Sequence, residues 1–366
     1  MNFKHDRKIN IKDIYILCIS TVIIFFGNLV SFSSFRLNEF VTDRYLLVFV
    51  LLILLFSYIR WRSPYNLQFL VIWFLFIISI LFSKIINEEY NLIDIFVLMV
   101  FVPWLFRIER RYLYLLCWST TIAFIPFIFE YGVNGFNSYG ITTALIGINT
   151  AILLYLSNRQ NSFRISVLIL ITTVLLIYLR SRTALISFLI GGFVLIYFSI
   201  NKIKSKKKFF YYILFSTSII LFCYFYLDAI SNLIFNKWQV SEEDITTGRA
   251  EIWTYLFSND ISIFGKGSSY FWNTFEHMDA HNIFMQLLGR YGLVSMVLFL
   301  VLVLYILKLI IQVNAKERIA FLAFFGVYFA LGMFENTLFV DIKTFSISLL
   351  FIIYIAMLLQ ANKRNS

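Results

Sequence analysis

Long apolar runs dominate this sequence, and they constrain the fold more than any other feature. An α-helix crosses the hydrocarbon of a bilayer with about 20 mostly apolar residues. About twelve runs approach that length, at residues 14–31, 44–59, 67–83, 92–106, 112–130, 139–157, 165–179, 183–200, 209–227, 282–307, 319–334 and 343–360. Each run must be helical, because hydrocarbon offers no partner to the backbone groups of an open strand. The sequence therefore predicts an all-α, polytopic membrane bundle of about 12 transmembrane helices.

The composition excludes the alternative classes for a chain of 366 residues. Apolar residues make up 60% of the chain and charged residues 14%, whereas soluble domains have about 45–50% and about 25%. The three cysteines lie inside apolar runs without a CxxC pattern, which argues against a disulfide framework or a zinc site. A soluble multi-domain enzyme is excluded, and residues 1–366 are interpreted as a single polytopic membrane domain.

The distribution of charge predicts the orientation in the membrane. Lys and Arg collect in cytoplasmic loops. When the basic N-terminus is placed in the cytoplasm and the spans alternate, most of the 31 Lys and Arg residues fall on the cytoplasmic side and most of the 20 Asp and Glu residues on the other. Both termini are then cytoplasmic. The formal net charge of +11 is a topological signal, and no nucleic-acid partner is expected.

One connection is much longer than the others, and it falls on the outer face. This loop covers residues 228–281, and long structured loops are usually functional. Thr247 and Gly248 can cap a helix that runs from Arg249 to Phe257, with Glu251 in the first turn, where the helix dipole favours an anion. An aromatic stretch at 270–275 follows. Its rings could stack on sugar faces or form an interfacial aromatic belt.

Two arginines mark a second feature on the same face. Arg180 and Arg182 lie in the short turn between the seventh and eighth spans. Ionisable groups at membrane depth are costly and mark functional sites. One interpretation is an anion clamp, since the fork of a guanidinium suits diphosphate oxygens. The alternative is that both side chains reach out to lipid phosphates.

These segments resemble the O-antigen ligase and polymerase superfamily, the Wzy-like membrane proteins of bacterial surface polysaccharide assembly. The resemblance covers roughly residues 170–305 and depends on the order of several short motifs. The matching segments are residues 180–185 (RSRTAL), 248–253 (GRAEIW), 264–267 (FGKG), 281–282 (HN), 286–288 (QLL) and 292–293 (GL). Ser295 departs from the pattern, because many relatives have a glycine there.

The resemblance implies a multi-span glycosyltransferase that needs no metal or other cofactor. Its donor would be a glycan on undecaprenyl diphosphate, and its acceptor a hydroxyl of a second lipid-linked glycan. By position, Arg182 and Arg249 would bind the diphosphate, with Arg180 and Lys266 nearby. His281 would act on the acceptor hydroxyl.

The residue types support this chemistry independently of the family. Negative charge builds on the departing diphosphate, and the outer face has no DxD pair to hold a metal, so arginines are the available counter-charge. The base should titrate near neutral pH, as imidazole does. His281, at the junction of loop and span, is better placed than His277, although it could instead be a solvated rim residue. Other candidate residues are Glu276, Asp279, Asn282, Arg290 and Glu335, where the acids are reserve bases or solvated loop residues.

The leading hypothesis is a polymerase that joins lipid-linked repeat units into an O-antigen, capsule or exopolysaccharide chain. The closest rival is a ligase that moves the finished glycan to lipid A core or another acceptor. A flippase of lipid-linked oligosaccharide is less favoured, because few charged residues lie deep inside the spans. The expected location is the bacterial cytoplasmic membrane. Expected partners are the lipid-linked donor and acceptor, membrane lipid, a chain-length regulator and a repeat-unit flippase.

Overall fold

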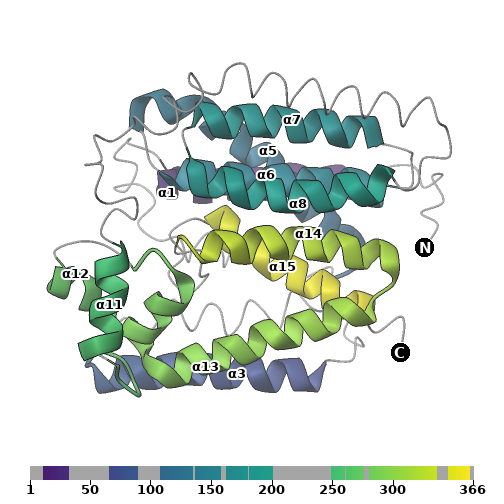
Figure 1. Ribbon diagram of the computed structural model, residues 1–366. Helices are drawn as coiled ribbons and strands as arrows, with labels where there is room; N and C mark the ends of the chain where they lie inside the picture. Colours follow the sequence, from purple (N-terminus) through teal and green to yellow (C-terminus); the bar gives the residue numbers. More distant parts are fainter. Residues whose placement is uncertain are drawn as a thin grey trace. The chain divides into compact units, whose positions relative to one another are not determined.

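A computed structural model shows a chain made of α-helices (Figure 1). It describes residues 11–32, 66–89, 108–134, 137–157, 162–179, 181–200, 249–259, 261–275, 280–335 and 345–362. The helices are α1 (Ile11–Phe32), α3 (Leu67–Ile86), α5 (Arg110–Asn134), α6 (Asn137–Leu156), α7 (Ser162–Tyr178), α8 (Arg182–Ile200), α11 (Arg249–Asn259), α12 (Tyr270–Phe275), α13 (Ile283–Gln312), α14 (Ala315–Gly332) and α15 (Phe345–Asn362). Within the described residues, no other helix or strand is present.

These helices confirm the predicted polytopic membrane fold. Five of the described helices are long and apolar enough to cross a bilayer: Ile11–Leu29, Leu67–Ile86, Arg110–Ile128, Tyr139–Leu156 and Ile283–Gln312. Shorter apolar helices cover Phe163–Tyr178, Arg182–Phe198 and Ser346–Asn362. Each agrees with a predicted run to within a few residues, and α14 lies at the run predicted for 319–334. The runs predicted at 44–59, 92–106 and 209–227 lie outside the described residues.

The chain divides into two compact helix groups. The first group comprises residues 1–7, 126–245 and 315–328, and in it α6, α7 and α8 pack against one another (Figure 1). Glycines on α6 allow this close packing. A Cβ atom at Gly140 would lie 2.2 Å from the Cβ atom of Ser181, and one at Gly147 would lie 2.4 Å from Thr172 Cγ2. Small residues at such contacts are typical of membrane helix pairs.

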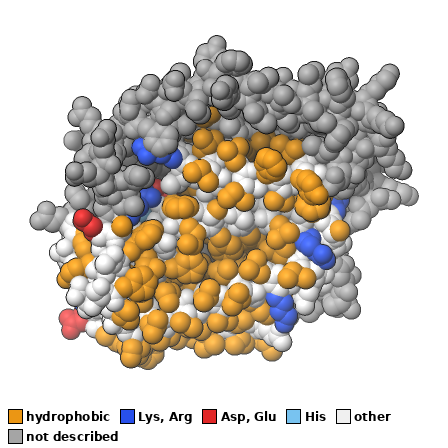
Figure 2. Space-filling view, viewed as in Figure 1, with side chains coloured by type: hydrophobic (Ala, Val, Ile, Leu, Met, Phe, Trp, Pro, Cys, Tyr) orange, Lys and Arg blue, Asp and Glu red, His pale blue; other side chains and the backbone are white. Residues whose placement is uncertain are grey.

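The second helix group comprises residues 8–125, 246–314 and 329–366. Its main feature is the antiparallel pair of α3 and α13, which lie side by side in Figure 1. Phe76 packs on Phe299 near the middle of the pair, and Ser79 Oγ lies 2.9 Å from Ser295 Oγ. Hydrophobic side chains cover the outward side of these helices (Figure 2), as expected for a surface that faces lipid.

A break interrupts α13 at Gly292, where φ is 84° and ψ is 178°. The residues at 262–267 dock into this break through four backbone hydrogen bonds. Lys266 N–H donates to Gly289 O, Gly267 N–H to Arg290 O, Leu293 N–H to Ser262 O, and Val294 N–H to Ile263 O. The Ser295 hydroxyl donates to Tyr291 O at 3.0 Å. The departure from glycine at position 295 thus supplies an extra hydrogen bond beside the break.

Candidate active site

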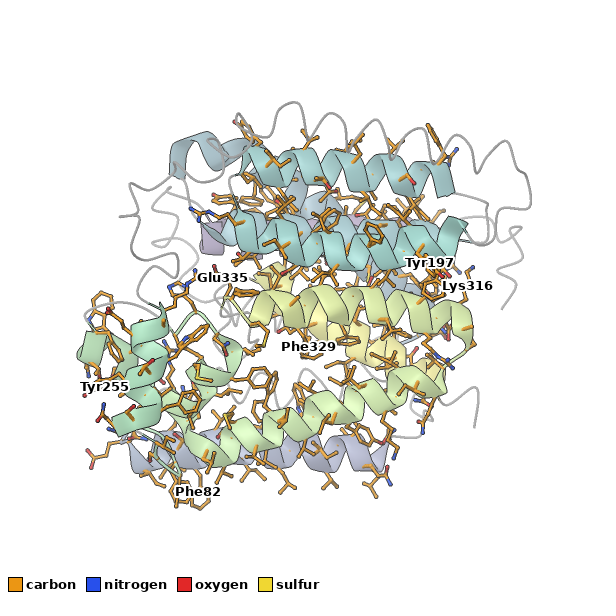
Figure 3. All side chains as sticks on the ribbon, in the orientation of Figure 1. Phe82, Tyr197, Tyr255, Lys316, Phe329 and Glu335 are labelled. Atoms are coloured by element: carbon orange, nitrogen blue, oxygen red, sulfur yellow. The ribbon has the colours of Figure 1, made fainter. Side chains whose placement is uncertain are left out.

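Three segments of the second helix group bring a cation, an imidazole and a carboxylate together. Arg249 is the first residue of α11, and His281 precedes α13. Glu335, which is labelled in Figure 3, follows α14. Glu335 Oε1 accepts from Arg249 Nη2 at 3.1 Å, and Glu335 Oε2 lies 3.1 Å from His281 Nδ1. Arg249 Nη1 also donates to Phe334 O at 2.7 Å. One carboxylate therefore links the predicted cation to the predicted base.

The burial of this Arg249–Glu335–His281 cluster leaves a reactive edge open. The side chain of Glu335 is 9% exposed, that of Arg249 17% and that of His281 28%. The Nε atom of Arg249 is buried and has no hydrogen-bond partner in the described part of the chain. A guanidinium has five N–H donors, and two of them are used by Phe334 and Glu335. Of the remaining donors, one N–H on each Nη atom is used by neither of these contacts.

The backbone before His281 is fixed from two sides. Ala280 N–H donates to Gln286 Oε1 at 2.8 Å, and Ala280 O accepts from Trp253 Nε1 at 2.7 Å. His281 itself has a φ of 49°, a left-handed conformation that few residues other than glycine adopt. Such strain persists where the surrounding contacts enforce it, and it gathers at functional sites. The strained backbone and the two hydrogen bonds of Ala280 fix the backbone position from which the His281 side chain extends.

Asn282 has a structural role in this arrangement. Its Oδ1 accepts from the backbone N–H groups of Phe284 and Met285, so it caps α13, and its Nδ2 donates to Met333 O at 2.9 Å. The cap satisfies N–H groups that the first helical turn leaves without partners. The same side chain ties the start of α13 to the end of α14, and this tie keeps His281 beside Glu335.

An aromatic cluster seats α11 next to the cluster of reactive groups. Leu256 of α11 is buried with Tyr270, Phe271, Ala280 and Leu288, and Ile252 packs against them. Ile252 and Leu256 therefore form the packed apolar side of the helix. Tyr255 is partly exposed and its ring meets the Phe275 ring edge-on at 5.4 Å. The aromatic stretch at 270–275 thus forms the platform that holds α11.

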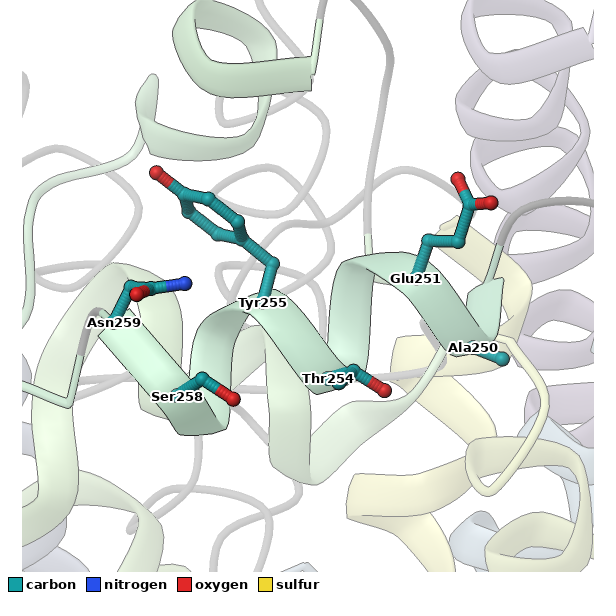
Figure 4. Close-up of a pocket in the computed structure, with 6 residues that line it drawn as sticks. All are labelled: Ala250, Glu251, Thr254, Tyr255, Ser258 and Asn259. Atoms are coloured by element: carbon teal, nitrogen blue, oxygen red, sulfur yellow. The ribbon is translucent and has the colours of Figure 1, made fainter.

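Six mostly polar residues of α11 line a shallow depression along the helix (Figure 4). It is lined by Ala250, Glu251, Thr254, Tyr255, Ser258 and Asn259, all exposed. The depression begins one residue after Arg249 and follows the helix for about 13 Å, at about 1.5 Å per residue. It offers hydroxyl, amide, phenol and carboxylate groups beside the Arg249–Glu335–His281 cluster.

The other predicted cations have different outcomes. Arg182 begins α8 in the first helix group, and its predicted approach to Arg249 stays a prediction. Lys266 lies in the segment docked at the break of α13, with its ammonium 5.6 Å from the centre of the Tyr270 ring. Arg290 is in the last turn before the break, and its carbonyl accepts from Ser83 Oγ at 3.2 Å. Arg180, Glu276, His277 and Asp279 lie outside the described residues.

The sequence did not predict the contacts of three residues, Trp253, Gln286 and Glu335. Trp253 and Gln286 were recognised only as parts of motifs, but they hold the residue before His281. Glu335 was expected as a reserve base, yet it pairs with both Arg249 and His281. Its position directly after an apolar span was the only available signal. Where the chain is described, no three His, Cys, Asp or Glu side chains form a group that could hold a metal ion.

Comparison with protein-family models gives a match to part of the chain. Residues 165–300 match the family model described as O-antigen ligase, which confirms the resemblance deduced from the motifs. The matched stretch includes Arg182, Arg249 and His281, whereas Glu335 lies beyond it. Searches of the curated proteins and of the solved structures give no significant match.

Proposed function

We propose that this chain, which matches the O-antigen ligase family model at residues 165–300, polymerises a bacterial surface polysaccharide. It would transfer a glycan from undecaprenyl diphosphate to a sugar hydroxyl of a lipid-linked repeat unit. The reaction would occur on the outer face of the cytoplasmic membrane, with both termini of the chain in the cytoplasm. The observation that carries this proposal is the contact of one carboxylate, Glu335, with both Arg249 and His281.

Arg249 is proposed to bind the diphosphate of the donor. One N–H on each of its two Nη atoms is left by the contacts within the described residues. Arginine forms strong, directional hydrogen bonds with phosphate oxygens. Such groups, fixed before the reaction, stabilise the charge that develops on a leaving group. Arg182 would add a second guanidinium, with Arg180 and Lys266 close by.

His281 is proposed as the general base. With the Nδ1 proton donated to Glu335 Oε2, the lone pair of Nε2 is free to accept the proton of the acceptor hydroxyl. The hydroxyl oxygen then bonds to the anomeric carbon of the donor as the bond from that carbon to the diphosphate oxygen breaks. The diphosphate leaves with the bonding electrons, and the imidazolium is stabilised by the Glu335 carboxylate, as in other base–carboxylate pairs.

The depression along α11 is a suitable surface for the glycan near the reaction. It begins beside Arg249, and its side chains can exchange hydrogen bonds with sugar hydroxyls. A chain-length regulator and a repeat-unit flippase are the expected protein partners.

The second candidate is ligation of a finished glycan to lipid A core or another acceptor. The description of the matching family favours it, and it would use the same arginine and histidine. Deletion of the gene separates the two functions. Loss of the long-chain ladder on a gel, with glycolipid that carries single repeat units, supports the polymerase. Long chains that persist without reaching their final acceptor support the ligase.

A further inference from the structure

Glu89 contacts a segment of the outer loop that lies 179 residues further along the chain. It is the last described residue after α3. Its Oε1 accepts from the backbone N–H of Ser268, and its Oε2 accepts from Ser268 Oγ at 2.5 Å. Glu89 also lies outside the stretch that matches the family model. This contact therefore joins the end of α3 to the outer segment that carries Lys266.

The backbone before Glu89 is held in an uncommon conformation. Glu88 N–H donates to Ile85 O and Glu89 N–H donates to Lys84 O, the two bonds of a Schellman motif at the end of α3. Glu88 takes the left-handed position of that motif, with a φ of 57°, where glycine is usual because a side chain costs about 1–2 kcal/mol. The turn nevertheless closes on a glutamate and directs the next carboxylate at Ser268.

Two glycines let the outer segment approach its anchors. Gly265 has a φ of 76°, and a Cβ atom there would lie 2.3 Å from Arg290 O. Gly267 has a φ of 90°, and a Cβ atom there would lie 2.6 Å from Glu89 Oε1. The segment is thus pressed against α13 on one side and against the Glu89 carboxylate on the other. Ser83, in the last turn of α3, donates its hydroxyl to Arg290 O. This hydrogen bond connects α3 directly to α13.

Lys266 lies between these two glycines. Its backbone N–H donates to Gly289 O, and its ammonium lies over the Tyr270 ring at 5.6 Å. The next residue but one, Ser268, is fixed by Glu89. A lysine side chain is flexible by itself, so the position of its ammonium depends on how firmly the backbone on each side is held.

We infer that Glu89 is a positioning residue, which fixes the 265–268 segment so that the Lys266 ammonium is held ready for the diphosphate of the donor. The inference rests on the proposed function, because it takes Lys266 to be a donor-binding residue. Glu89 itself does not touch substrate. It acts through the Ser268 backbone, and loss of its contact lets Lys266 sample positions away from the donor.

The test is a double-mutant cycle in purified full-length protein. The donor is the lipid-diphosphate-linked repeat unit extracted from a strain that lacks the gene. Glu89→Gln is nearly isosteric but keeps one acceptor oxygen for two donors, and it should raise KM for the donor about 5–10-fold with kcat within about twofold. Lys266→Ala should raise KM at least as much. In the Lys266→Ala background, Glu89→Gln should have no further effect on KM.

Glu88→Gln is the matched control. It removes the same charge from the neighbouring residue, whose side chain is exposed. Ser268→Ala, which removes the hydroxyl donor and keeps the backbone one, should raise KM less than Glu89→Gln does. Equal KM values for Glu89→Gln and Glu88→Gln would overturn the inference, as would KM effects that multiply in the double variant. If Lys266→Ala leaves KM unchanged, Glu89 cannot act through Lys266, and this result leaves the His281 chemistry of the proposed function standing.

Discussion

Replacement of Glu335 by Gln is the most informative perturbation of the candidate active site. The carboxylate accepts from Arg249 Nη2 and contacts His281 Nδ1, both at 3.1 Å. A glutamine has one acceptor oxygen and one NH2 group. If the oxygen keeps Arg249, the NH2 group faces Nδ1, and the neutral imidazole must carry its proton on Nε2. Nε2 then has no lone pair to accept the proton of the acceptor hydroxyl. If the oxygen keeps His281, the NH2 group faces the guanidinium.

The expected effect can be bounded from general energetics. A hydrogen bond to a charged group contributes about 1.5–3 kcal/mol, and each 1.36 kcal/mol of activation energy is a tenfold change in rate. Loss of the carboxylate alone therefore predicts a decrease in kcat of about 10–100-fold. A wrongly protonated imidazole costs more, since the comparable Asp→Asn change in a Ser-His-Asp triad lowers kcat about 10⁴-fold. We expect kcat of Glu335→Gln to fall between about 10²- and 10⁴-fold.

The assay measures release of undecaprenyl diphosphate and growth of the glycan by purified protein, with thermal unfolding followed in parallel. Glu88→Gln is the control, because this acid lies exposed after α3 and outside the candidate site, so its loss should leave kcat within about twofold. A Glu335→Gln variant that folds and keeps kcat within threefold of the native protein would refute the proposed role of the carboxylate in orienting His281.

Four further predictions concern the clamp, the broken helix, the glycan surface and metals. Arg249→Lys keeps the charge but cannot reach Phe334 O, Glu335 and a diphosphate at once, so kcat/KM in initial-rate assays should fall about 10–100-fold. Native-like kcat/KM values would contradict the binding of the diphosphate by Arg249. Gly292→Ala places a Cβ atom 2.3 Å from Ile263 O at a positive φ, and should destabilise the protein by at least about 1–3 kcal/mol. Thermal unfolding checks this against Gly326→Ala, where no atom lies within 4 Å, and equal stability of both variants would contradict the packing. The double variant Thr254→Ala, Ser258→Ala should raise KM for glycans of several repeat units and leave KM for a single sugar unchanged. Thr274→Ala on α12 is the control and should leave both KM values unchanged. An equal effect of the double variant on every glycan length would contradict a glycan-binding role for the α11 depression. EDTA should leave turnover unchanged, and activity that is lost and then restored by Mg²⁺ or Mn²⁺ would overturn the guanidinium-based scheme.

Hydropathy predicts the helices well because it is a local property. A membrane span must satisfy its backbone internally and face lipid, so the apolar run alone locates α3 and α15 to within a few residues. The break in α13 is less visible. Gly292 is one glycine in a long apolar run, and only the hydrogen bonds with Ser262 and Ile263 explain why the helix opens there.

The candidate site was predicted in its parts but not in its connections. Arg249 and His281 were found from motifs, whereas their common partner Glu335 follows His281 by 54 residues and comes from a different span. Contacts between spans depend on helix packing, which leaves no periodic pattern in the sequence. The same holds for Glu89 and Ser268. The predicted proximity of Arg182 to Arg249 depends on contacts of this kind.

The central claim is that His281 deprotonates the acceptor while guanidinium groups receive the departing diphosphate. The most direct measurement is single-turnover transfer by purified His281→Ala and native protein, at saturating donor, with elongated glycan and released undecaprenyl diphosphate quantified by mass spectrometry. The account predicts that His281→Ala binds the donor with unchanged affinity and transfers it at least about 100-fold more slowly. Transfer at the native rate by His281→Ala would contradict it.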